Sequence, residues 1–113
     1  MTNENIADFT QEEKEELEER VLKLSKTYNF EGEEINTVDL SGLDNVSANQ
    51  MIQAQKMITK SGNITGLLET NIEYLLILAS FASGRPIEFF KQLNAKDVVK
   101  VKNRVTGFFF TEE

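Results

Sequence analysis

The chain contains neither cysteine nor histidine. The lack of cysteine excludes disulfides, thiolate nucleophiles and zinc–thiolate sites. The lack of histidine removes the usual general base near neutral pH and the commonest ligand of transition metals. Because the familiar nucleophile–base pairs are missing, we expect no enzyme, no cofactor and no bound metal.

Carboxylates remain, but their spacing indicates neither a metal site nor a phosphate site. Residues 39–45 hold the nearest candidate for calcium or magnesium, and they lack the alternating acidic positions of a calcium loop. Gly62 and Gly66 form no phosphate-binding loop, because no Gly-Lys-Ser/Thr sequence follows them. The acidic residues show no spacing that an acid–base mechanism requires, so binding is the expected role.

Long apolar runs are also missing. The longest, residues 74–79, has six residues, far fewer than the roughly 20 that span a bilayer. The first residues lack the basic and apolar regions of a signal peptide. We therefore expect a cytoplasmic protein with no membrane partner.

The net charge of −7 is concentrated at one end of the sequence. Residues 1–20 carry eight acids and two bases, whereas the other 93 residues carry eleven acids and ten bases. We expect residues 1–19 to form an acidic arm, partly disordered or a short helix over about 11–18, and residues 20–113 to form a single α+β domain. This charge balance argues against a nucleic-acid partner.

A period of two residues predicts a β-hairpin near the start of the domain. Glu31-Gly32 is a turn signal, because glycine accepts positive φ, and the strands are expected at about 20–30 and 33–40. A helix continued through Leu24 is the alternative, since Leu17, Val21 and Leu24 are spaced i, i+4, i+7. The alternating apolar residues of the first strand are Leu22, Leu24, Tyr28 and Phe30.

Capping patterns predict two helices in the middle of the chain. Ser47 with Gln50 opens a helix over 48–60, and Thr70 with Glu73 opens one over about 71–83. The second helix is apolar on nearly every side, so it should be buried centrally, within the fold or at a subunit interface. Gly84 supplies its C-terminal cap.

Two more helices are expected after Gly84. Pro86, the only proline, suits the first position of a short helix over 86–93. Asn94 caps a last helix over about 95–110, which carries Asp97 in its first turn. A hairpin of 98–102 and 104–110 is the alternative, because five β-branched residues weaken the helix propensity. The expected fold is a small α+β domain, mostly helical, with an N-terminal β-hairpin and about four α-helices.

Three consecutive phenylalanines, residues 108–110, end the last predicted helix. At helical spacing their side chains fan over about 200° of surface, so they cannot all face one core. Phe108 is expected to pack on the face of Val98, Val101 and Val105, which leaves Phe109 and Phe110 for contact with a partner. The basic row of Lys96, Lys100 and Arg104 is typical of a solvated helix face.

Flexible and aromatic apolar side chains are the candidates for protein binding, because such surfaces adapt to a partner. Methionine at helical spacing is nevertheless more often plain core. The candidate protein-binding residues are Met51, Met57, Phe89, Phe90, Phe109 and Phe110.

Several segments carry a family resemblance over residues 21–110. They are residues 24–32 (LSKTYNFEG), 38–43 (VDLSGL) and 79–86 (ASFASGRP), then Phe89, Leu93, Asp97, Val98 and residues 105–109 (VTGFF). Together they resemble the tail assembly chaperones of long-tailed bacteriophages that infect Gram-positive hosts. The motifs are turns and helix ends with no catalytic signature, and the acidic arm has no match in the family pattern.

The resemblance implies a protein made in the host cytoplasm and missing from the mature virion. Such chaperones bind the long helical tape measure protein, keep it soluble and help tail tube subunits polymerise around it. Homo-oligomers are expected. Many such chaperones have a longer product made by ribosomal frameshifting, and the Phe run would fit a slippery tract of uridines. The alternatives are a structural virion protein and an inhibitory module that acts as an acidic decoy of DNA.

Overall fold

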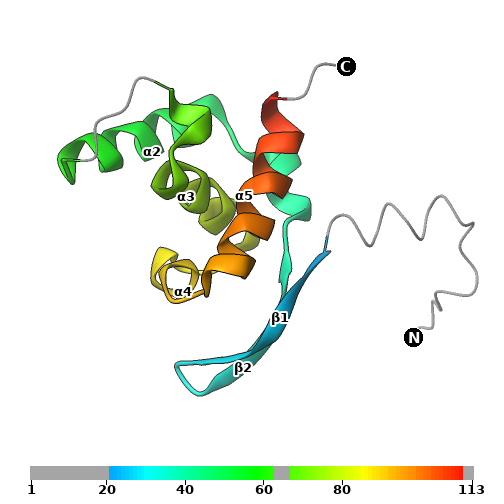
Figure 1. Cartoon of the computed structure of the whole chain (residues 1–113). Coiled ribbons are helices and arrows are strands. Elements are labelled where there is room, and N and C mark those ends of the chain that lie inside the picture. Colours follow the sequence, from blue (N-terminus) through cyan, green and yellow to red (C-terminus); the bar gives the residue numbers. More distant parts are fainter. Residues whose placement is uncertain (1–20, 63–66, 111–113) are drawn as a thin grey trace, which may run out of the picture.

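A computed structural model describes residues 21–62 and 67–110. This part of the chain has an antiparallel hairpin followed by four α-helices, so the predicted α+β class is confirmed (Figure 1). The predicted acidic arm and its short helix lie outside the described residues. The elements are β1 (Val21–Phe30), β2 (Glu33–Asp39), α2 (Ala48–Lys60), α3 (Ile72–Ser83), α4 (Ile87–Lys91) and α5 (Ala95–Phe110), with 3-10 turns at Ser41–Asn45 and Leu68–Thr70.

The hairpin turn is where the sequence predicts it. Glu31 and Gly32 both have positive φ, 52° and 84°, the combination that a two-residue turn needs to match the twist of its strands. The alternative of a helix continued through Leu24 is wrong, because Val21 already belongs to β1 and pairs with Asp39.

A long bulge interrupts β1. Lys23 pairs with Thr37 and Tyr28 pairs with Ile35, so residues 24–27 of β1 lie opposite a single residue of β2. A bulge takes backbone groups out of the strand ladder and re-aims the side chains next to it. The side chain of Tyr28 is buried, and backbone groups of the bulge are free to bond outside the sheet.

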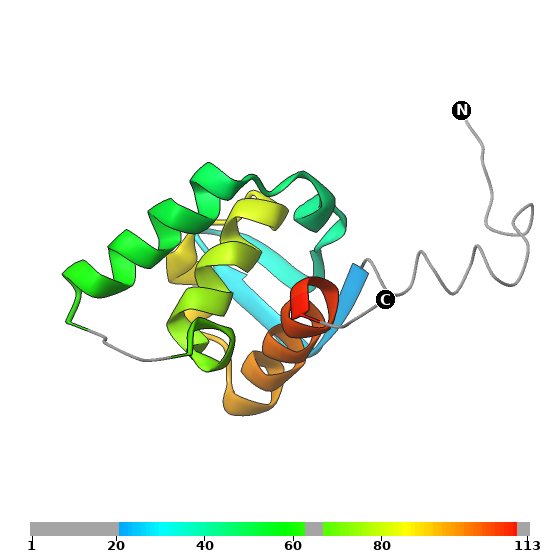
Figure 2. The same ribbon diagram turned by 90° about the horizontal axis from the view of Figure 1, so that it is seen from above.

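Helix α3 is the centre of the molecule. It packs against α2, α4, α5, the turn Ser41–Asn45 and β2, and six consecutive residues from Tyr74 to Ala79 are buried. Figures 1 and 2 show the other helices arranged around it, with the helical layer on one face of the hairpin. The central position predicted for this helix is confirmed within the fold, and Gly84 ends it at φ 76° as expected.

The two predicted capping boxes have different outcomes. The box at Ser47 is present, with Gln50 N donating to Ser47 Oγ at 3.2 Å and Ser47 N donating to Gln50 Oε1 at 3.1 Å. The box at Thr70 is wrong: Asn71 caps α3 by accepting from Tyr74 N at 3.0 Å. The hydroxyl of Thr70 instead donates to Leu67 O in the preceding turn, so α3 begins one residue later than predicted.

The C-terminal segment is one continuous helix, and the alternative hairpin over 98–110 is wrong. Asn94 starts α5 as predicted, since its Oδ1 accepts from Asp97 N at 2.8 Å. Val101 and Val105 are completely buried. Burial of this face and the cap outweigh the low helix propensity of β-branched residues, because that propensity costs only a few tenths of a kcal/mol per residue.

Aromatic rings join the hairpin to α4, which is shorter than predicted. The ring of Phe89 lies edge-on to Tyr28, Phe30 and Phe90, with centroids 6.1, 5.6 and 5.3 Å away. A bidentate ion pair adds a second link, because Arg85 reaches both carboxylate oxygens of Glu33 at 2.9 and 3.1 Å. The core is therefore continuous from the sheet to the helices.

The glycine at position 42 is predicted to be indispensable for this packing. A Cβ added there would collide with the backbone carbonyl of Ala82 in α3. We expect Gly42→Ala to lower the free energy of unfolding by more than about 2 kcal/mol, since a backbone contact cannot give way as a side chain can. Urea unfolding of the variant and of the wild type measures this difference in free energy.

Gly32→Ala is the matched control. It meets no atom within 4 Å but sits at φ 84°, so it should cost only about 1 kcal/mol. An equal effect of the two substitutions would contradict the close approach of the turn to α3.

Candidate protein-binding surface

The most connected polar group in the described structure is the carboxylate of Asp97. It accepts hydrogen bonds from Ser25 N at 2.8 Å, Ser25 Oγ at 2.9 Å and Tyr28 OH at 2.7 Å. Tyr28 OH also accepts from Asn94 N at 3.0 Å, and Asn94 Nδ2 donates to Ser25 Oγ at 3.3 Å. The cluster ties the bulge of β1 to the first turn of α5.

The electrostatics of this cluster favour the charged carboxylate. Burial by itself raises the pKa of Asp97, but the hydrogen bonds from Tyr28 and Ser25 and the positive charge of Lys100 outweigh it, so the pKa lies below its usual value. Burial also raises the pKa of the Tyr28 phenol. Asp97 is therefore a weak base held in place by its donors, an arrangement suited to anchoring two elements.

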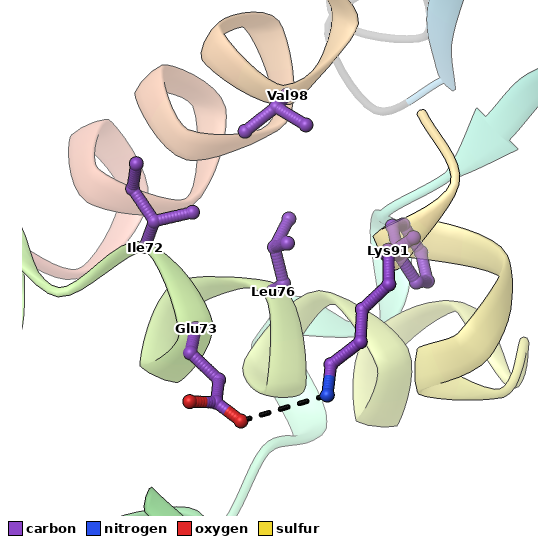
Figure 3. A pocket seen from close by; sticks show the side chains of 6 residues that line it. Ile72, Glu73, Leu76, Lys91 and Val98 are labelled. Carbon is purple, nitrogen blue, oxygen red and sulfur yellow. Dashed lines mark ion pairs between the residues drawn. The ribbon is translucent and has the colours of Figure 1, made fainter. Parts of the chain in front are cut away.

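An open apolar groove lies on another side of α5. It has a volume of about 540 Å³ and lies between α3, α4 and α5 (Figure 3). Figure 3 shows Ile72 of α3 and Val98 of α5 on one side of Leu76, with the ion pair of Glu73 and Lys91 on the other. The residues that line it are Ile72, Glu73, Leu76, Phe90, Lys91 and Val98.

The groove combines an exposed apolar wall with a charged rim. Ile72 is 47 % exposed although it begins the central helix. Lys91 Nζ lies 3.7 Å from Glu73 Oε2 across the gap between α4 and α3. Apolar area at the centre with charge at the edge is the usual composition of a protein-binding patch, and a groove between helices fits the apolar face of another helix.

Phe89 and Phe90, two of the predicted contact residues, are buried in the core and not on the surface. Both are 0 % exposed. The two adjacent phenylalanines of α4 face different parts of the structure. Phe89 packs on the rings of the hairpin, and Phe90 lines the groove. Among the predicted contact residues whose side chains the structure describes, only Phe90 lines this groove.

The exposure of Phe108 and Phe109 is the reverse of the predicted arrangement. Phe108 is 47 % exposed, whereas Phe109 is partly buried against the core, and the two rings meet edge to face at 5.0 Å. Phe108 continues the stripe of Val101 and Val105, but it stays exposed near the end of α5. The side chain of Phe110 lies outside what the structure describes.

The two methionines lie on α2, away from the groove. Met51 is half-buried against the core, and Met57 is 40 % exposed. A smaller hollow of about 410 Å³ runs along the outer side of this helix, and neither methionine lines it. Its lining residues are Ile52, Gln55, Lys56, Thr59 and Lys60.

Apart from Phe90, the residues that line the groove were not selected from the sequence. Ile72 and Leu76 share one side of α3 at a spacing of i, i+4, and this was the one available signal. In a helix that is apolar all round, such spacing does not reveal which side its neighbours leave uncovered.

The comparisons with known proteins do not identify the chain. No protein-family model, curated protein or solved structure matches it. Within residues 21–62 and 67–110, no helix combines the length and apolarity needed to cross a membrane. The same residues contain no group of three acidic side chains placed to hold a metal ion.

The Asp97 cluster predicts a specific pH dependence of stability. Because the folded pKa lies below the unfolded one, the stabilisation is complete above the unfolded pKa, about 3.9, and is lost as pH falls through the folded pKa. We expect Asp97→Asn to lower the free energy of unfolding at pH 7 by about 1–3 kcal/mol. The free energy of unfolding of this variant should also fall less steeply than that of the wild type between about pH 5 and about pH 2. Urea titrations at several pH values measure this.

Asp39→Asn is the matched control. Hydrogen bonds from Ser41 lower the pKa of Asp39 too, yet this carboxylate is exposed. Its substitution should cost less than about 1 kcal/mol at pH 7. Equal losses for the two variants would contradict the anchoring role of Asp97.

The reassigned phenylalanines yield a second prediction. Phe90→Ala should cost about 3–5 kcal/mol, the usual loss for a buried aromatic, while Phe108→Ala should cost less than about 1 kcal/mol. Thermal unfolding measures both, with Phe90→Leu in reserve if Phe90→Ala does not fold. A larger loss at Phe108 would restore the core role that the sequence predicts for it.

Proposed function

We propose that this protein is a bacteriophage tail assembly chaperone that binds an amphipathic helix of the tape measure protein. The observation that carries the proposal is the open apolar groove between α3, α4 and α5, in which Ile72 is left half-exposed. The binding keeps the client in solution while tail tube subunits assemble around it in the host cytoplasm. The chaperone then leaves the particle.

The geometry of the groove supports binding of a helix. Three apolar side chains of the groove come from separate helices, Leu76 from α3, Phe90 from α4 and Val98 from α5, so the groove runs between helices as in other helix-in-groove complexes. The pair of Glu73 and Lys91 at its edge offers one charge of each sign. A partner helix would present apolar residues at i, i+3 or i+4 and i+7, with polar residues at its margins.

The class of client comes from the resemblance of residues 21–110 to tail assembly chaperones. The charge distribution fits a solubilising partner, because the acidic excess of the sequence lies in residues 1–20 and in the last two residues, outside the groove-forming helices. Self-association and a longer frameshifted product belong to the same proposal. The acidic decoy finds less support, since the described residues carry ten bases and nine acids.

The test is co-expression with a tape measure protein, the client that the proposal names. Wild-type protein should hold this client in the soluble fraction. Ile72→Ser should weaken binding about tenfold or more, because burying an isoleucine side chain contributes about 1.5–3 kcal/mol. The variant itself should stay folded, since the residue is exposed.

Ile52→Ser is the control, because Ile52 is 50 % exposed on α2 outside the groove. It should hold the client as well as the wild type does. A client that stays insoluble beside the wild type would refute the chaperone function. Equal loss with both variants would refute the groove as the binding surface.

A further inference from the structure

Helix α5 and strand β1 pack together and carry several cations. We call these cations the α5–β1 basic surface. Lys100 joins the two elements, since its Nζ donates to the backbone carbonyl of Lys23 at 3.1 Å. The residues of this surface are Lys23, Lys26, Lys96, Lys100 and Arg104.

Few negative charges pair with these cations within the described part of the chain. Asp97 lies 3.9 Å from Lys100, but it is fully buried and already accepts three hydrogen bonds. Among residues 21–62 and 67–110, neither Lys96 nor Arg104 has an ion pair. Arg104 Nη1 is buried and lacks an acceptor there, and an unpaired charged donor is costly.

The chain itself carries the complementary charge. Residues 1–20 have eight acids and two bases, whereas the described residues have ten bases and nine acids. This acidic stretch joins the described structure at Val21, two residues before Lys23 of the basic surface. An extended segment reaches about 3.3–3.6 Å per residue, so 20 residues exceed the roughly 24 Å length of α5.

We propose that the acidic segment of residues 1–20 binds the α5–β1 basic surface of the same chain. Each exposed ion pair is worth less than about 1 kcal/mol, but several pairs act together, and covalent attachment raises the local concentration of the segment to about the millimolar range. Any outside polyanion must displace the segment to reach the surface. The contact is independent of the proposed chaperone function.

The absence of cysteine makes a direct test possible. A single Gln11→Cys substitution creates a unique site for a nitroxide spin label and leaves every charge in place. In nuclear magnetic resonance spectra of the full chain, the label should broaden the backbone amides of Lys96, Lys100 and Arg104. The amides of Lys56 and Lys60 on α2 should keep their intensity. Raising the salt from about 0.01 M to about 1 M shortens the Debye length from roughly 30 Å to roughly 3 Å and should remove the broadening.

Matched charge reversals identify the surface. Lys96→Glu with Arg104→Glu should abolish the broadening, and Lys56→Glu with Lys60→Glu should preserve it. If the first variant does not fold, a variant with glutamine at Glu12, Glu13, Glu15 and Glu16 of the segment takes its place. The broadening should be abolished equally.

Three outcomes would overturn the proposal. The first is no broadening of α5 at low salt, and the second is equal broadening of α5 and α2. The third comes from a mixture of isotope-labelled copies and spin-labelled copies. If the amides of the isotope-labelled copy are broadened as strongly as in the singly labelled chain, the segment that binds the surface belongs to a second molecule.

Discussion

The carboxylate of Asp97 is the interaction on which the rest of this fold depends. A two-stranded hairpin is at best marginally stable alone in water, and this one is interrupted by a bulge. The bulge exposes the backbone of Ser25, and Asp97 accepts its N–H. The same carboxylate holds Tyr28 OH, whose ring lies against Phe89 of α4. One side chain thus connects the sheet, α4 and α5.

The position of Asp97 also links the fold to the proposed function. The next residue, Val98, lines the apolar groove, so the bonds that fix the rotation of α5 toward the hairpin also place Val98 opposite α3. Burial of a charge is costly unless donors surround it. Here the three donors are supplied by the hairpin and by no part of α5 itself. Any arrangement that buried this charge away from these donors would be costly, which makes the association of the two elements specific.

Local signals made much of the fold predictable. The turn at Glu31 and Gly32, the cap at Ser47 and the ends of α5 all follow from short-range chemistry, and each is found where the sequence predicts it. The order of elements was predictable for the same reason. Thr70 was misread because Asn71, one residue later, is an equally good cap.

The surface was less predictable, because exposure depends on packing between distant segments. Phe108 follows the apolar stripe of α5, yet it is left uncovered. Phe90 is buried because α4 packs on α3, and Phe89 packs on the rings of the hairpin. The hydrogen bonds of the Asp97 cluster between β1 and α5 join residues 66 to 72 positions apart. No spacing rule reaches across such a distance, so the sequence showed Asp97 only as a favourable charge in a first helical turn.

The pKa of Asp97 is the most direct test of this account. Carbon-13 chemical shifts of its carboxyl group, followed through an acid titration of the folded protein, report that value for this residue alone. We expect a pKa of Asp97 below that of an ordinary aspartate, about 3.9, together with a pKa of Tyr28 above that of an ordinary phenol. A pKa of Asp97 at or above the ordinary value would show that burial outweighs the donors, and it would contradict the anchoring role of this carboxylate.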